Sequence, residues 1–256
     1  CTVLDGALLA SLFFEPSTRT RVSFASAFNL LGGKVMETVG MASSSLSKGE
    51  SLFDTAQVIS GYADVIAMRH PEAHSVSEFA QGATVPVLNG GDGANEHPTQ
   101  ALLDTFTIFD ELSRVGKTTD TIKVAMVGDL KNGRTVHSLS RILSLFPNIV
   151  FTFVSPMALT MPDKIQAVCT QAGHKVSHTE SLSAGIAGQD VVYLTRVQEE
   201  RFDSQQEADQ YRGKYRLTEA LYQEFCAENT IVMHPLPRDS RPQANELSDE
   251  MNANPN

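Results

Sequence analysis

Short apolar runs alternate with amphipathic stretches along almost the whole of this 256-residue chain. The apolar runs have the length of strands, and most are rich in Val, Ile and Phe, which is typical of strands buried on both faces. The stretches between them have helical periodicity. This order predicts parallel sheets covered by helices. The expected strands are residues 8–14, 34–39, 64–68, 85–88, 122–127, 149–154, 190–194 and 230–233.

The first expected helix has a recognisable start and end. Ser17 or Thr18 is a suitable N-cap, and apolar side chains then recur at helical spacing from Phe24 to Leu31. A glycine pair beginning at Gly32 ends the pattern. The segment therefore predicts a strand, a loop and a helix in direct succession.

A polar stretch at residues 113–121 separates two halves of the chain. It follows a long helical pattern and precedes a strand, so we interpret it as a linker. The fold class that we expect is α/β, with two doubly wound domains, residues 1–112 and 122–256, each with a central parallel sheet flanked by helices. Strands so close to both ends predict that further segments outside this span cover the sheet faces.

Composition excludes several classes of protein. The formal net charge of −10 argues against non-specific nucleic-acid binding, which needs clustered Lys and Arg. No apolar run approaches the roughly 18 to 20 residues that span a bilayer, so we expect no membrane segment. Cys1, Cys169 and Cys226 lie far apart, without the spacing of metal ligands. We therefore expect no disulfide framework, no metal site and a cytoplasmic location.

Hydroxyl and guanidinium groups gather at the start of the first expected helix, in Ser17, Thr18, Arg19, Thr20 and Arg21. A helix N-terminus favours phosphate or carboxylate, and hydroxyls and Arg add donors of matching geometry. The alternative is an ordinary helix cap with solvated arginines. Residues 1–112 contain five Lys or Arg against thirteen Asp or Glu, so these few cations favour an anion site.

Two further segments of the first half carry polar groups at strand ends. Arg69 follows the strand at 64–68, and ligands of open α/β sheets bind beyond the carboxyl ends of strands. The glycine-rich segment 89–100 predicts a flexible loop that lets main chain approach a ligand. His97 and Gln100 are three residues apart at a helix start, so we expect both to face the same crevice. The alternative for His97 is a structural role.

The second half contains a turn with two glycines at residues 128–135, and its sequence nearly matches the phosphate-loop motif. Arg134 occupies the position where that motif requires Lys, which argues against the alternative of a nucleotide-binding protein. Arg196 and Gln198 follow another strand, and a proline-rich turn occupies residues 234–238. No motif of an activated nucleophile is present, which favours direct transfer between two bound substrates.

Taken together, five motifs resemble the signatures of the transcarbamoylases between about Leu8 and Arg238. They are FEPSTRTR (14–21), MRHP (68–71), HPTQ (97–100), GRTVHS (133–138) and HPLPR (234–238). The ornithine-specific branch of this family carries a cysteine in the last motif, where Pro235 stands here. Two arginines, Arg134 and Arg196, suit a substrate with two carboxylates, so the resemblance is to the aspartate-specific branch. Carbamoyl transfer to another amino acid such as ornithine, and a non-catalytic carboxylate-binding relative, are the alternatives.

The resemblance implies transfer of the carbamoyl group from carbamoyl phosphate to L-aspartate, in pyrimidine biosynthesis, without a cofactor or a metal. Thr20, Arg69 and His97 would be catalytic by polarising the carbonyl group. The carbamoyl phosphate ligands would be Ser17, Thr18, Arg19, Thr20, Arg69, His97, Gln100, Leu236 and Pro237. The aspartate ligands would be Arg134, Arg196, Gln198 and, from an adjacent subunit, Lys48.

The resemblance also implies a homotrimer with shared active sites. Regulatory or fused pathway partners are compatible with it. The family's N-terminal and C-terminal helices are not found in this span, and Asn132 stands where several relatives have an aromatic residue.

Overall fold

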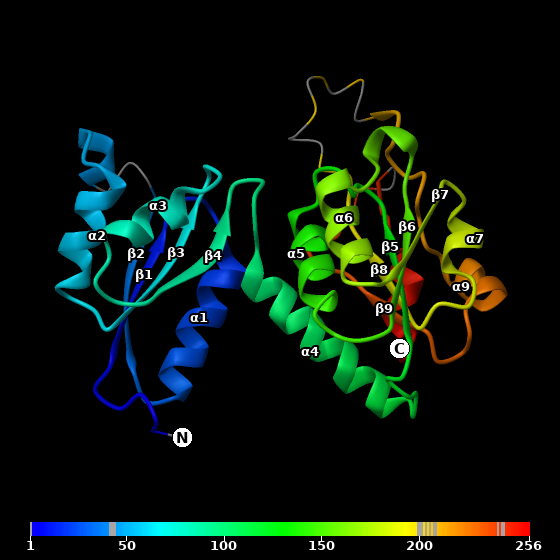
Figure 1. Cartoon of the computed structure of the whole chain (residues 1–256), viewed down its shortest axis with the longest axis horizontal. Coiled ribbons are helices and arrows are strands. Elements are labelled where there is room, and N and C mark those ends of the chain that lie inside the picture. The colour runs from blue at the N-terminus through cyan, green and yellow to red at the C-terminus, as the bar shows by residue number, and fades with distance from the viewer. Residues whose placement is uncertain are drawn as a thin grey trace. The chain divides into compact units, whose positions relative to one another are not determined.

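The computed structural model describes residues 2–40, 45–198, 202, 204, 206, 209–239, 241 and 244–256. Packing divides the chain into two compact units, Cys1–Thr99 and Gln100–Asn256. Each unit contains a parallel sheet with helices on both faces (Figure 1). The expected α/β fold class is therefore confirmed.

The described residues of the first unit form a four-stranded parallel sheet in the order β2-β1-β3-β4. Its strands are β1 (Leu8–Phe13), β2 (Lys34–Val39), β3 (Val65–His70) and β4 (Val87–Asp92). Its helices are α1 (Thr18–Leu30), α2 (Leu52–Ser60) and α3 (Ser75–Gly82), with a 3-10 helix, η2 (Ser45–Lys48).

Alternation along the strands gives this first sheet two apolar faces. Leu9 of β1 packs with Phe28 of α1 on one face. Leu12 and Ile66 pack with Phe79 of α3 on the other face, and α2 joins the same cluster. Figure 1 shows α1 on one side of the sheet and α2 and α3 on the other. The sheet is thus doubly wound, as predicted.

The described residues of the second unit form a five-stranded parallel sheet in the order β7-β6-β5-β8-β9. Its strands are β5 (Ile122–Val127), β6 (Ile149–Val154), β7 (Lys175–Thr179), β8 (Val191–Leu194) and β9 (Ile231–Met233). Its α-helices are α4 (Pro98–Arg114, which begins in the first unit), α5 (Arg134–Leu143), α6 (Asp163–Gln171), α7 (Leu182–Ile186) and α9 (Glu219–Phe225), with 3-10 helices η3 (Met157–Leu159) and η5 (Asp249–Ala253).

Two apolar clusters cover this second sheet. Met126 and Tyr193 belong to a cluster that α4, α5 and α6 complete, whereas Val127 belongs to one completed by α7 and α9 (Figure 1). Helix α4 buries Ile108 and Leu112 in the first of these clusters, which explains why the division between the units falls at Thr99 and Gln100.

The predicted linker overlaps the end of α4. Ser113 and Arg114 are the last two residues of that helix, so the connection to β5 begins only after them. The domain boundaries drawn from the sequence, residues 1–112 and 122–256, stay a prediction.

Several expected elements differ in their details from the structure. Strand β7 was not predicted, because its sequence, KVSHT, is mostly polar and its residues are largely exposed at the sheet edge. The predicted glycine loop begins too early, since β4 continues through Gly90 and Gly91 to Asp92. Strand β3 likewise runs through Arg69 to His70. The strands at 34–39, 122–127 and 149–154 have the predicted bounds.

Among the described residues, no helix combines the length and apolar character needed to cross a membrane. The same part of the chain contains no group of three or more His, Cys, Asp or Glu side chains arranged to hold a metal ion.

Candidate functional site

The first unit has a topological switch point between β1 and β3. The chain leaves β1 toward β2 on one side, and β3 lies on the other side. Open α/β sheets bind ligands beyond the carboxyl ends of strands at such a point. Residues 14–20 follow β1, and Arg69 is the penultimate residue of β3. The sheet order therefore brings two of the predicted motifs to one place.

Arg69 is the centre of this arrangement. Its Nε atom pairs with Glu15 Oε1 at 2.6 Å. Its Nη1 atom lies 3.5 Å from Thr20 Oγ1, 3.4 Å from the carbonyl oxygen of Gly90 and 3.4 Å from His97 Nε2. The three residues predicted to be catalytic thus meet around one guanidinium group.

The chemistry of arginine fixes the donors in this cluster. A guanidinium has no acceptor, so Arg69 donates and the Nε2 atom of His97 accepts. The Arg69 side chain is 12% exposed, which leaves it within reach of a ligand. Glu15 was not predicted as a site residue. Its position inside the first motif, between a strand and the Ser-Thr-Arg segment, was the available signal.

The start of α1 has the features of an anion site rather than an ordinary cap. Ser17 is the N-cap, but within the described residues its side chain makes no capping hydrogen bond, and the first turn of α1 holds no acidic residue. Thr18 and Arg19 are exposed. Arg21 instead lies 3.7 Å from Glu37 of β2, as a partly exposed ion pair. The helix N-terminus thus presents backbone N–H groups, hydroxyls and one exposed guanidinium.

A buried carboxylate holds the turn between β4 and α4. Asp92 Oδ1 accepts from Asn89 Nδ2 at 3.0 Å and from the backbone N of Glu96 at 3.1 Å. Its Oδ2 accepts from the backbone N of His74 at 2.9 Å and from Asn95 Nδ2 at 3.0 Å. The prediction of a flexible loop was wrong, because four donors bind this one side chain and fix the approach to α4.

Gln100 lies in the first turn of α4 and contacts a second buried acid. Its Nε2 atom donates to Asp104 Oδ1 at 2.9 Å, and the Tyr193 hydroxyl donates to Asp104 Oδ2 at 2.6 Å. Burial raises the pKa of Asp104 to about 6, against the lowering effect of these two hydrogen bonds. Asp104 could not be selected from the sequence, since one acid on a helix is usually exposed.

The second unit has its own switch point, between β5 and β8. Asp129 follows β5 and is fully buried. It accepts from the backbone and side chain of Asn132 at 3.0 to 3.1 Å and from the backbone N of Gln198 at 3.2 Å. Burial raises the pKa of Asp129, and these hydrogen bonds act in the opposite direction. The sequence did not explain why Asn stands at position 132. In the structure, Asn132 holds the loop between β5 and α5 against Asp129.

The segment after β8 is tied to the same loop. Gln198 Nε2 donates to the carbonyl oxygen of Asn132 at 2.8 Å. Gly128 has φ of 117°, and a Cβ there would collide with the carbonyl oxygen of Thr195, so only glycine fits. Arg134, the first residue of α5, is thereby placed after one of the two strands that flank the switch point. Gln198 follows the other.

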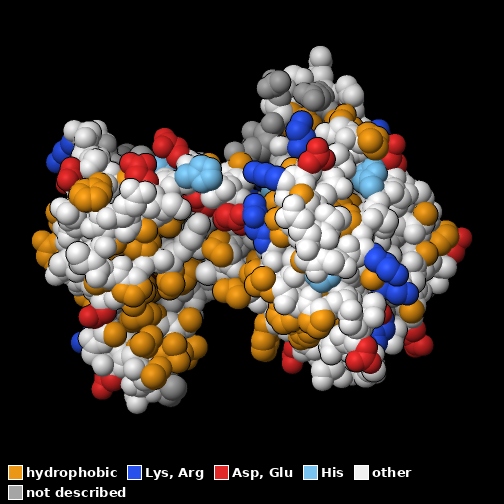
Figure 2. Space-filling model, in the orientation of Figure 1, with side chains coloured by type: hydrophobic (Ala, Val, Ile, Leu, Met, Phe, Trp, Pro, Cys, Tyr) orange, Lys and Arg blue, Asp and Glu red, His pale blue; other side chains and the backbone are white. Residues whose placement is uncertain are grey.

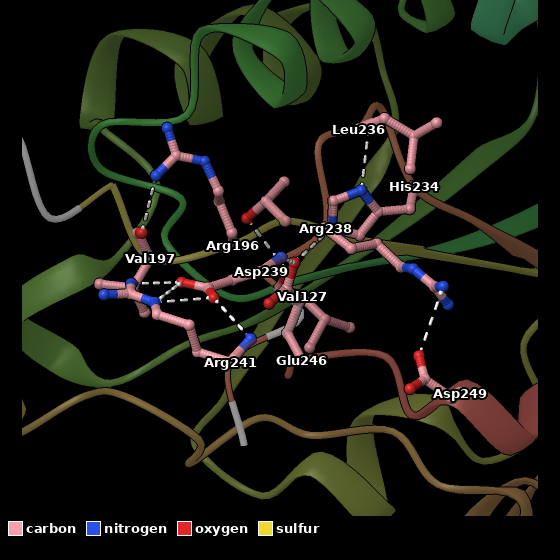
Figure 3. Close-up of polar contacts among 11 residues, drawn as sticks. Val127, Arg196, Val197, His234, Leu236, Arg238, Asp239, Arg241, Glu246 and Asp249 are labelled. Carbon is pink, nitrogen blue, oxygen red and sulfur yellow. Dashed lines mark hydrogen bonds and ion pairs between the residues drawn. The ribbon is translucent and has the colours of Figure 1, made fainter. Parts of the chain in front are cut away.

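The proline-rich turn follows β9 and is braced by a buried pair (Figure 3). His234 Nε2 lies 2.8 Å from Glu246 Oε1, and the backbone N of Leu236 donates to His234 Nδ1 at 2.9 Å. Since Nδ1 accepts, the ring proton is on Nε2 and faces Glu246. Leu236, with φ of 56°, is exposed, as is Pro237. The turn therefore leaves both residues open to solvent.

Arg196 lies beside this turn (Figure 3). Its Nη1 atom donates to the carbonyl oxygen of Val197 at 3.3 Å. Nearby, Arg241 pairs with Asp239 and lowers its pKa, and the charge of Arg196 adds a smaller effect in the same direction. Thr195 and Val197 after β8, together with Asp239 and Glu246 after β9, line one hollow in this unit.

Lys48 is the last residue of η2 and is exposed. The serine-rich loop predicted around it falls partly on residues 41–44, which lie outside the described residues. Its predicted contact with an adjacent subunit stays a prediction.

Comparison with known proteins gives a consistent result. Residues 1–110 match the family described as aspartate/ornithine carbamoyltransferase, carbamoyl-P binding domain, and residues 120–256 match its Asp/Orn binding domain. The aspartate carbamoyltransferase catalytic subunit of Cellvibrio japonicus is 63% identical over 254 residues, which are 99% of this chain and 75% of that protein.

Solved structures agree with these matches. Aspartate transcarbamoylase from Trypanosoma cruzi, in complex with carbamoyl phosphate and aspartate, has a TM-score of 0.86 and 40% identity, over 99% of this chain and 79% of that one. The catalytic subunit of Methanocaldococcus jannaschii aspartate transcarbamoylase has a TM-score of 0.85 and 43% identity, over 99% and 79% of the two chains.

Proposed function

This chain belongs to the aspartate/ornithine carbamoyltransferase family, and from that premise we propose that it transfers the carbamoyl group of carbamoyl phosphate to the amine of L-aspartate. The products are N-carbamoyl-L-aspartate and phosphate, the step expected in pyrimidine biosynthesis. The observation that carries the proposal is the meeting of Thr20, Arg69 and His97 at a switch point beside the N-terminus of α1.

The phosphate group binds at the start of α1. The backbone N–H groups of its first turn, the hydroxyls of Ser17, Thr18 and Thr20 and the guanidinium of Arg19 provide donors and positive charge for its oxygens. The carbonyl oxygen of carbamoyl phosphate then lies against Thr20, Arg69 and His97. Thr20 and Arg69 donate hydrogen bonds that stabilise the negative charge developing on that oxygen as the amine attacks, and His97 helps to hold Arg69 in place through its Nε2 atom.

The reaction needs no covalent intermediate with the protein. The aspartate nitrogen forms a bond to the carbonyl carbon, the bond from that carbon to the phosphate oxygen breaks, and the proton that the amine loses passes to the departing phosphate. Gln100 orients the amino group of carbamoyl phosphate, and the main chain of Leu236 and Pro237 orients the aspartate amine or the carbamoyl group through hydrogen bonds. Catalysis thus comes from orientation and fixed donors.

Aspartate binds in the second unit. Arg134 and Arg196 each bind one carboxylate, because a guanidinium fork matches carboxylate geometry. Gln198 supports this site through its hydrogen bonds to the Asp129 and Asn132 loop. Ornithine has one carboxylate and an amine at its other end, so it leaves one of these arginines without a partner.

A colorimetric assay for the ureido product tests this function. We expect turnover with carbamoyl phosphate and L-aspartate, and little or none with L-ornithine at equal concentration. A higher kcat/KM for ornithine would assign the chain to the other branch of the family. Tight binding of Mg-nucleotide without carbamoyl transfer would favour the nucleotide-binding alternative.

We also propose that the chain acts as a homotrimer in the cytoplasm, with Lys48 completing the site of an adjacent subunit. The first unit exposes large apolar side chains, including Phe53, Val58, Tyr62 and Leu88 (Figure 2). Apolar surface of this kind is typical of protein interfaces. Free thiols at Cys169 and Cys226 fit a reducing compartment.

Subunit complementation tests the shared site. Lys48→Ala and Arg69→Ala chains, each inactive alone, are mixed under conditions that exchange subunits. If Lys48 acts across the interface, some hybrid trimers contain one site with both native residues, and activity returns to a fraction of wild type. Near-zero activity in a mixture shown by mass to contain hybrids would contradict the shared site and leave the proposed reaction untouched.

A further inference from the structure

The side-chain amide of Gln100 has a defined orientation. Its Nε2 atom donates to Asp104 Oδ1 at 2.9 Å. An ionised carboxylate can only accept hydrogen bonds, so the amide nitrogen must face Asp104 and the amide oxygen must point elsewhere. The direction in which Gln100 offers its acceptor is therefore set by its neighbour one helical turn away, not by Gln100 itself.

Asp104 is itself held in place from the other side. Its side chain is buried, and the hydroxyl of the fully buried Tyr193 donates to Oδ2 at 2.6 Å. The side chain of Thr135 in turn hydrogen bonds to that hydroxyl. Each carboxylate oxygen thus has its own donor, and a pKa of about 6 keeps the group ionised at neutral pH. A flipped Gln100 amide would place one acceptor oxygen against another, which is unfavourable.

We propose that Asp104 is a positioning residue that makes Gln100 present its acceptor oxygen to the amino group of carbamoyl phosphate, and so selects carbamoyl phosphate over acyl phosphates without an N–H. The proposal rests on the proposed function. Acetyl phosphate is the informative competitor, because it has a methyl group where carbamoyl phosphate has an amino group. The two have nearly the same size, so they differ mainly in the hydrogen bond that only carbamoyl phosphate can donate.

The substitution Asp104→Asn replaces the acceptor that faces the Gln100 amide with a donor. The new side chain keeps one oxygen, which the Tyr193 hydroxyl retains, and turns its own N–H₂ group toward Gln100. The Gln100 amide then rotates, so that its oxygen faces the new side chain at position 104 and its N–H₂ group faces the substrate. A donor then opposes the carbamoyl amino group, whereas a methyl group is little affected.

The experiment measures two constants in the complete chain at neutral pH, the KM of carbamoyl phosphate and the Ki of acetyl phosphate as a competitor. In the wild type we expect a clear preference for carbamoyl phosphate. In Asp104→Asn the ratio of the two constants should shift by about tenfold or more against carbamoyl phosphate, with the Ki of acetyl phosphate nearly unchanged. Asp110→Asn, on the exposed face of α4, is the matched control and should leave both constants unchanged.

A double variant identifies the route of the effect. If Asp104 acts through Gln100, then Asp104→Asn should not alter the ratio further in a Gln100→Met background. A merely structural defect would raise both constants by the same factor, and that result would overturn the proposal. An unchanged ratio would overturn it as well.

Two outcomes separate this inference from the proposed function. A wild-type chain that does not carbamoylate aspartate would refute the function, whereas an active wild type that does not distinguish the two phosphates would refute only the inference. If Asp104→Asn does not fold, Gln100→Met replaces it. That variant removes the acceptor offered to the carbamoyl amino group, and a ratio that stays at the wild-type value would then overturn the proposal.

Discussion

The two units organise their candidate sites around groups of opposite charge. In the first unit, Glu15, Thr20 and His97 all contact the guanidinium of Arg69. In the second unit, the central groups are carboxylates: Asp104, which orients Gln100, and Asp129, which holds the loop before α5.

Burial explains why these centres have different tasks. The Arg69 side chain is 12% exposed and carries a guanidinium group, so it can meet a ligand directly. Asp104 is 3% exposed and Asp129 is fully buried, so they act by accepting hydrogen bonds from neighbouring residues. The partly exposed guanidinium of Arg69 is thus open to a ligand, whereas the two buried carboxylates hold other side chains in position.

The largest effect should come from Arg69→Ala. Losing one preorganised donor at a developing oxyanion typically lowers kcat by on the order of 10²–10³, or roughly 3–4 kcal/mol. Because Arg69 lies at a strand end beside the site, we expect the circular dichroism spectrum and the unfolding midpoint to change little. A folded variant with near-normal kcat would remove Arg69 from the mechanism and end the contrast between the two units.

Asp104→Asn should change how stability depends on pH. Burial raises the pKa of Asp104 from 3.8 to about 6, so folding favours the protonated form. Its contribution to the free energy of unfolding is largest below pH about 4, falls as pH rises to about 6 and is constant above that. The total change is about 3 kcal/mol at most.

Urea unfolding at a series of pH values measures this effect. The difference in unfolding free energy between wild type and Asp104→Asn should shrink as pH rises from about 4 to 6, and Asp110→Asn should show no such trend. A difference that is constant across this range would show that Asp104 titrates alike in the folded and unfolded chain.

Arg134→Ala and Arg196→Ala should mainly raise the KM of aspartate. A hydrogen bond to a charged group contributes about 1.5–3 kcal/mol, so we expect an increase of roughly 10- to 100-fold in each variant. Equilibrium binding of a carbamoyl phosphate analogue to the free enzyme should persist. Loss of that binding with an intact aspartate KM would show that the substrates are assigned to the wrong units.

The smallest effect should come from Arg21→Ala. Arg21 belongs to the same sequence motif as Arg19, but it pairs with Glu37 at 3.7 Å on a partly exposed surface. Such pairs contribute about 0–1 kcal/mol to stability. Steady-state kinetics and thermal unfolding should both remain close to wild type. A loss of kcat comparable to that of Arg69→Ala would place Arg21 in the site after all.

The central strands of both sheets could be predicted from the sequence, because burial on two faces demands largely apolar runs such as residues 122–127 and 149–154. Strand β7 could not, since an edge strand is exposed and its polar sequence resembles a loop. Gly90 and Gly91 produced the opposite error, since the sequence predicted a loop at residues that belong to β4. They form an irregularity within β4: the pairing with β3 skips from Asn89 to Asp92, and Gly91 has φ of 117°, a conformation that favours glycine.

The residues of the site follow a similar division. Thr20, Arg69, His97, Arg134 and Arg196 could be chosen from the sequence, because each stands at the end of a predicted strand or the start of a predicted helix. Of their supporting acids, Glu15 lies inside the first motif and could have been chosen as well, whereas Asp104 resembles any other carboxylate in a chain with thirty of them.

The sequence by itself determined the alternation of strands and helices, and with it the two-unit α/β fold and the motifs at the strand ends. Those properties depend on local periodicity, which a chain carries in its residue order. Only the tertiary structure decided that Asp104 meets Tyr193, 89 residues away, and that Asp129 meets Gln198, 69 residues away. A buried carboxylate acquires its role from the donors that packing brings to it, and no local pattern encodes such a meeting.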